Sequence, residues 1–206
     1  MRGRRLAIAA GAAALLAPIA VARPAGDPAL VQVLVAPAAG PADVATGVPV
    51  GPGRVLTVAH VLEAGGRVSV RGPDGRARRA RVARLDRRAD LALLDVPGLR
   101  AATLRAEGSR PARPARLLLR RAGGVEARAV GVRRRIVARF HGPPGTPVRV
   151  RPALELAAEV TGGDSGAPVV TAGGRVAGVV YARSRERAGT AYAVSAPAVA
   201  PLLRVR

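Results

Sequence analysis

Residues 161–168 read TGGDSGAP, a short stretch in which three glycines surround a single serine, Ser165. Glycine adopts backbone conformations that are closed to other residues. A turn so rich in glycine can therefore aim a serine hydroxyl and two backbone N–H groups at the same point. The stretch favours a nucleophilic site over an ordinary surface turn.

Two motifs that precede this turn supply the partners that a nucleophilic serine needs. His60 ends the apolar run LTVAH at 56–60, and Asp90 heads the apolar run LALL at 91–94. Either residue alone would be commonplace. Together, in the order His, Asp, Ser, they fit a general base, the acid that orients it and the nucleophile. An α/β-hydrolase esterase is disfavoured, because that fold requires GxSxG and places the histidine last.

The blocks TVAHV, ADLALL and GGDSGAP resemble the triad blocks of trypsin-like serine peptidases, and the likeness runs from about residue 30 to the end. It is most similar to Cys-free bacterial members, such as HtrA-type and cell-envelope serine proteases. The resemblance implies an all-β, chymotrypsin-type fold of two six-stranded antiparallel β-barrels, with the active site between them. It also implies catalytic roles for His60, Asp90 and Ser165, and an oxyanion hole made by the N–H groups of Gly163 and Ser165.

Short Val- and Leu-rich runs between Gly- and Pro-bearing turns support the all-β interpretation independently. The turn Pro73-Asp74-Gly75 indicates a hairpin. Residues 105–114 resemble a connection, which predicts one barrel over about 27–105 and a second over about 112–206, and the proline-rich 141–147 is expected to be a loop. Predicted strands cover 30–35, 46–50, 55–59, 67–71, 78–84, 91–96, 115–119, 126–132, 148–151, 167–170, 176–180 and 191–194, with a helical turn at 198–203.

The family resemblance also implies a substrate-binding edge. Tyr181, Ala182 and Arg183 are expected to line the cleft and to pair with the substrate backbone, with Tyr192 on the neighbouring strand. Two clues to specificity conflict. Arg183 stands where a glycine is common in trypsin, and it is expected either to narrow the cleft or to favour acidic substrate side chains, whereas Glu159 stands near trypsin's pocket acid and favours basic ones.

In zymogen-type members of the family that this sequence resembles, the residue that corresponds to Asp164 pairs with an N-terminus created by cleavage. No suitable Ile or Val follows a plausible activation site in this sequence. An arginine partner for Asp164 or a pre-formed site is therefore expected.

The N-terminus has the features of an export signal. Arginines at 2, 4 and 5 precede an apolar run over 6–21, and small residues at 20 and 22 fit a signal-peptidase site, so residues 1–22 are predicted to be a signal peptide. An uncleaved anchor and a twin-arginine signal are the alternatives. The protein is expected to be secreted, periplasmic or bound to the cell envelope.

Composition narrows the partners. The formal charge is +21, every basic residue other than histidine is Arg, and there is no Cys, so disulfides and thiol chemistry are excluded. The charge favours nonspecific attraction to anionic envelope surfaces. Aromatics are too few for a specific nucleic-acid module. A polypeptide substrate is predicted, with no cofactor and no metal. The oligomeric state stays open, and a catalytically impaired, peptide-binding pseudoprotease is the alternative function.

Overall fold

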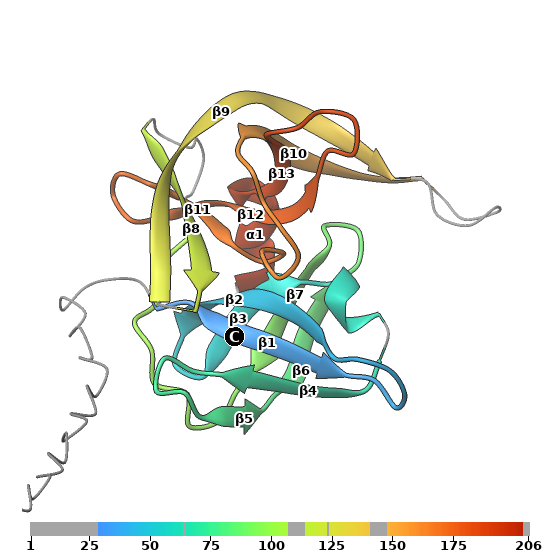
Figure 1. Cartoon of the computed structure of the whole chain (residues 1–206), viewed down its shortest axis with the longest axis vertical. Coiled ribbons are helices and arrows are strands. Elements are labelled where there is room, and N and C mark those ends of the chain that lie inside the picture. Colours follow the sequence, from blue (N-terminus) through green and yellow to red (C-terminus); the bar gives the residue numbers. More distant parts are fainter. Residues whose placement is uncertain (1–28, 64, 107–113, 123, 141–147, 204–206) are drawn as a thin grey trace, which may run out of the picture.

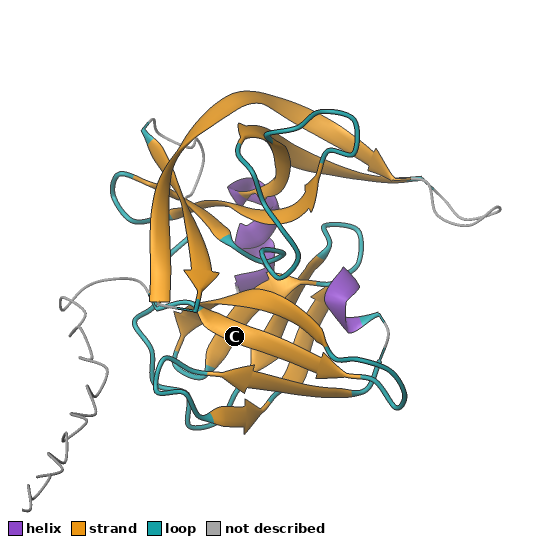
Figure 2. Cartoon of the chain, viewed as in Figure 1, coloured by secondary structure: helices purple, strands orange, loops and turns teal. Residues whose placement is uncertain are grey.

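The computed structural model describes residues 29–63, 65–106, 114–122, 124–140 and 148–203. The predicted signal peptide and the predicted loop at 141–147 lie outside these ranges. Strands dominate the described chain, and two sheets account for all of the named ones (Figure 2). The all-β prediction is confirmed.

The first sheet is built from the N-terminal half and is antiparallel throughout, in the order β5-β4-β1-β2-β3-β7-β6. One predicted strand, 78–84, is divided into two strands that are interrupted at Ala80. The Ala80 N–H donates a hydrogen bond to the Val68 carbonyl. Because β5 and β6 sit at opposite ends of the order and are joined directly through Ala80, the sheet curls back on itself. Its strands are β1 (Val31–Ala36), β2 (Asp43–Gly51), β3 (Arg54–Val58), β4 (Arg67–Arg71), β5 (Ala77–Arg79), β6 (Arg81–Asp86) and β7 (Leu91–Asp95).

The second sheet is a closed six-stranded barrel in the order β10-β13-β12-β11-β8-β9. The strand predicted at 126–132 begins at Gly124 and runs on to Phe140; its residues 124–130 pair with β8 and its residues 131–140 pair with β10. The three consecutive arginines at 133–135 all reach solvent because the pairing of β9 with β10 shifts register there at a bulge, while Ile136 and Phe140 are partly buried and pack against the core. The strands are β8 (Ala115–Arg121), β9 (Gly124–Phe140), β10 (Arg149–Ala157), β11 (Pro168–Thr171), β12 (Val176–Arg183) and β13 (Thr190–Ser195).

The two sheets pack against each other around a shared apolar cluster. Val58 and Leu93 of the first sheet belong to the same buried cluster as Val179 and Val194 of the second. The only helix of more than one turn in the described chain, α1 (Ala196–Leu203), packs against β7 on one side and β12 on the other (Figure 1). Within the described ranges, no helix is long and apolar enough to cross a membrane.

Candidate active site at the junction of the two sheets

His60 opens a single turn of 3-10 helix, η1 (His60–Leu62), directly after β3. Two backbone contacts fix this turn against the β6–β7 connection: the Ala59 N–H donates to the Asp90 carbonyl, and the His60 N–H donates to Asp90 Oδ1 at 2.8 Å. The imidazole then meets the other carboxylate oxygen, with 3.0 Å between His60 Nδ1 and Asp90 Oδ2. A proton on Nδ1 is thereby favoured, which leaves Nε2 free to accept one.

The backbone of Asp90 adopts an unusual conformation that positions this carboxylate. Its φ of 58° is the one positive φ of a non-glycine residue in the described chain. Asp tolerates this region better than most residues, yet the conformation still costs about 1 kcal/mol or more. The preceding turn is held by Asp86, whose carboxylate accepts the N–H groups of Arg88 and Ala89.

A buried arginine supports Asp90 from the second sheet. Arg151 lies on β10, and the distance from its Nη1 to Asp90 Oδ2 is 2.8 Å. Its side chain is 6% exposed. The guanidinium stacks on Phe140, 3.8 Å from the ring centre, and lies near the ring of Tyr181. Burial by itself would raise the pKa of Asp90, but the hydrogen bond from His60 and the charges of His60 and Arg151 lower it overall. The carboxylate therefore stays ionised.

Ser165 is held against the first sheet by one residue of β2. The Thr46 N–H donates to the Ser165 carbonyl at 2.7 Å, and the Thr46 hydroxyl donates to the Gly163 carbonyl at 2.8 Å. Thr57 in turn donates to the Thr46 carbonyl. Both ends of the turn that carries Ser165 are thus attached to the sheet that carries His60.

The glycines of the turn are needed for this approach. Gly163 and Gly166 have φ values of 88° and 91°. A Cβ on Gly166 would lie 1.9 Å from the Thr46 carbonyl oxygen, so any side chain there would force the two sheets apart.

Asp164, between Gly163 and Ser165, is buried and paired with an arginine. Arg121, at the end of β8, binds both of its carboxylate oxygens, and Thr161 donates to it from both its N–H and its hydroxyl. Burial would raise the pKa of Asp164, but the hydrogen bonds from Arg121 and Thr161 lower it overall. The expected arginine partner is confirmed and is Arg121.

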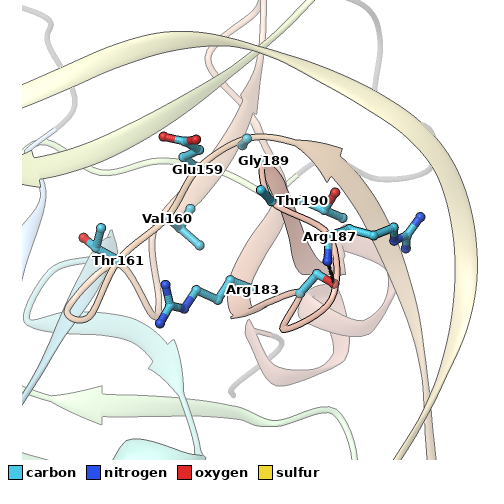
Figure 3. Close-up of a pocket in the computed structure, with 10 residues that line it drawn as sticks. Glu159, Val160, Thr161, Arg183, Arg187, Gly189 and Thr190 are labelled. Carbon is cyan, nitrogen blue, oxygen red and sulfur yellow. Dashed lines mark hydrogen bonds between the residues drawn. The ribbon is translucent and has the colours of Figure 1, made fainter.

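Of the predicted substrate-binding residues, Tyr181, Ala182 and Arg183 form the end of β12, Tyr192 lies opposite Ala182 on β13, and Glu159 follows β10. Tyr181 is buried between Phe140 and Tyr192, and burial raises its pKa to about 12. Glu159 and Arg183 line a pocket of about 220 Å³ between segments 158–161 and 183–190 (Figure 3). No group of three His, Asp or Glu side chains that could hold a metal ion occurs within the described residues.

Several contributors to this site carried no sequence signal. Arg151 lies in the alternating run VRVR, where it is indistinguishable from Arg149, and Thr46 stands in an ordinary apolar strand. A buried Glu155 within ALELA was detectable as an acid inside an apolar strand, but its partners were not.

Comparison with known proteins gives a consistent result. The model of the trypsin-like peptidase domain family matches residues 45–179. The serine protease Rv3671c of Mycobacterium tuberculosis is 34% identical over 160 residues, which are 75% of this chain and 40% of that protein. This chain therefore spans less than half the length of that relative.

Solved structures agree. The active form of Rv3671c superposes with a TM-score of 0.76 at 29% identity, covering 85% of this chain and 79% of the other. Its inactive form gives 0.68 at 29% identity, covering 84% and 86%. An HtrA-type protease solved with a tripeptide gives 0.68 at 19% identity, covering 86% and 59%, a likeness of fold alone. The resemblance to trypsin-like serine proteases is confirmed, and the HtrA-type protease shares the fold.

Proposed function

The chain belongs to the family of trypsin-like peptidase domains, and from that premise we propose that it is an exported serine endopeptidase with His60, Asp90 and Ser165 as its catalytic triad. The observation that carries the proposal is the Nδ1 to Oδ2 contact of 3.0 Å between His60 and Asp90, beside a Ser165 turn bonded to the same sheet. Acyl transfer requires a nucleophile, a general base and an acid that orients the base, and Ser165, His60 and Asp90 are the residue types that supply them.

In the proposed mechanism, His60 Nε2 takes the hydroxyl proton of Ser165 as the oxygen attacks a peptide carbonyl. The bond from carbon to the amide nitrogen then breaks, and His60 returns the proton to the leaving amine. Water repeats the sequence on the acyl-enzyme. Asp90, ionised and supported by Arg151, stabilises the imidazolium that forms at each step.

The oxyanion of the tetrahedral intermediate is assigned to the N–H groups of Gly163 and Ser165. Losing one such donor typically costs about 3 kcal/mol of transition-state stabilisation. The bonds from Thr46 to Gly163 and Ser165, and the Arg121–Asp164 pair between them, support a turn held rigid before substrate arrives. The higher TM-score against the active form of Rv3671c than against its inactive form favours a competent arrangement.

We extend the proposal to the whole chain as follows. Residues 1–22 act as a signal peptide, and residues 23–206 form the peptidase domain, with barrels over about 27–105 and 112–206. The mature protein is secreted, periplasmic or held at the cell envelope. Polypeptides are the substrate, and no cofactor takes part.

The decisive experiment uses a fluorophosphonate, which labels an activated serine covalently. We expect the protein to be labelled and Ser165→Ala to abolish labelling, while Ser69→Ala, a control on β4, keeps it. Labelling that survives Ser165→Ala refutes the assignment. A protein that binds peptides and resists labelling is the catalytically impaired pseudoprotease instead.

A further inference from the structure

Two adjoining hollows lie along β12 and share two arginines. The first is the pocket of about 220 Å³ between segments 158–161 and 183–190, and the second, of about 360 Å³, is lined by β9, β10 and the ends of β12 and β13. Arg183 and Arg187 line both. We call the pair of hollows the arginine groove, after its four arginines: Arg134, Arg139, Arg183 and Arg187.

Among the described residues, two carboxylates line the arginine groove, Glu155 and Glu159, and that of Glu155 is already neutralised. The Glu155 side chain is 4% exposed and accepts hydrogen bonds from Arg134 at 2.9 Å and from Arg187 at 3.0 Å. These bonds lower the pKa of Glu155, so it remains ionised. Arg187 also donates to the Tyr192 hydroxyl. Glu155 is therefore occupied with holding the groove together and is not available to a substrate.

The second carboxylate, Glu159, does not neutralise the pocket. Figure 3 shows its carboxylate turned away from the facing loop, while Arg187 points to the opposite side, toward Glu155. Arg183 instead extends beneath Val160 toward the turn at Thr161. Within the described chain, no hydrogen bond or ion pair reaches its guanidinium. This unpaired cation therefore faces the Thr161 side of the pocket, and Thr161 begins the turn that carries the proposed nucleophile Ser165 four residues later.

The edge of β12 would deliver a substrate to this cation. β11 pairs with β12 only as far as Val179, and Val180 bonds Gly166 and Ala167, so residues 181–183 have no strand beside them on that side within the described residues. A peptide added along this edge alternates its side chains across the strand and presents one of them to the pocket.

We propose that the first hollow of the arginine groove binds an acidic side chain immediately N-terminal to the cleaved bond, and that Arg183 is the residue that recognises it. The inference rests on the proposed peptidase function. A carboxylate fits because the planar guanidinium offers paired donors to it, and because the uncompensated charge disfavours a cation in the same place. The conflict between Arg183 and Glu159 seen in the sequence is thereby resolved in favour of Arg183.

The test measures kcat/KM on the full chain with peptides that differ only at the residue before the cleaved bond, which is Glu, Gln or Lys. Glu and Gln have nearly the same shape, so their ratio isolates charge. We expect Glu to exceed Gln by about ten-fold, since a single charge-assisted contact in an open pocket is of that order. The ratio should shrink in high salt.

Variants identify the residue. Arg183→Gln should bring the Glu-to-Gln ratio close to one, and Arg183→Glu should make Lys the preferred residue. Arg185→Gln, an exposed arginine on the same loop that lines neither hollow, serves as the matched control and should keep the wild-type ratio.

The outcomes separate this inference from the function on which it rests. Efficient cleavage with equal rates on Glu and Gln peptides overturns the specificity and leaves the peptidase intact. So does a Glu preference that survives Arg183→Gln, or one that appears only when Glu is placed two residues further upstream. Absence of both cleavage and fluorophosphonate labelling overturns the peptidase function itself, and the specificity with it.

Discussion

Replacing Arg121 with Gln removes the cation that holds Asp164 while keeping a polar side chain of intermediate length. The Asp164 side chain is 2% exposed, and Arg121 binds both of its oxygens. Removing one partner of a buried ion pair typically costs about 3–5 kcal/mol, because the other charge is left unpaired. Two features reduce the cost here: the Arg121 side chain is 35% exposed, so water can reach the vacated site, and Thr161 keeps its two bonds to Asp164.

We therefore expect Arg121→Gln to lower the free energy of unfolding by about 2–3 kcal/mol, which corresponds to roughly 4–12 °C in Tm for a domain of this size. Denaturant unfolding followed by circular dichroism measures it. The matched control is Arg128→Gln, which breaks the pair with Glu126; both of those side chains are at least 40% exposed, so the loss should stay below about 1 kcal/mol. Equal losses in the two variants would refute the reasoning.

The stability difference between wild type and Arg121→Gln should also depend on pH. Because the pKa of Asp164 is lowered in the folded protein, its ion pair contributes stability above the ordinary value of 3.8, and this contribution is lost as the pH falls through the lower folded value. The difference between wild type and Arg121→Gln should therefore be constant above about pH 5 and close as the pH falls toward about 2. A gap that stays constant in acid would show that the charge of Asp164 is not responsible.

Two more substitutions test the supports of the site. Thr46→Val keeps the shape of the side chain but removes the hydroxyl that donates to the Gly163 carbonyl. We expect kcat to fall about ten-fold with KM nearly unchanged, as for the loss of one buried hydrogen bond. Thr46→Ser keeps the hydroxyl and should retain most of the rate. An unchanged kcat in Thr46→Val would contradict a role in positioning the turn. Arg151→Met leaves the Asp90 carboxylate without its buried cation and should reduce both kcat and the free energy of unfolding, the latter by about 3 kcal/mol in denaturant titrations. Arg149→Met, an exposed arginine two residues away on the same strand, should stay within about 0.5 kcal/mol of wild type, and a similar loss in both would reject the special role of Arg151.

Much of this protein was determined by local sequence. Alternating apolar runs predicted the strands, because a strand buried on one face needs one apolar side chain in two. Pro73-Asp74-Gly75 predicted the β4–β5 hairpin, where Gly75 has a φ of 76°. The glycines around Ser165 predicted a tight turn because glycine readily adopts positive φ, and Gly163 and Gly166 both do so. Each of these features depends on a few consecutive residues and can therefore be predicted from a short stretch of sequence.

The tertiary structure decided which residues meet. Arg151 was one arginine among 34 basic residues until the barrel placed it, 61 positions further along the chain, against Asp90. Thr46 gained its role only because β2 passes beneath the Ser165 turn. The places of Glu159 and Arg183 around the pocket likewise depend on how segments 158–161 and 183–190 face each other (Figure 3). Contacts between distant segments follow from packing and strand register, which no short stretch of sequence encodes, and for this protein they determine the charge environment of the site.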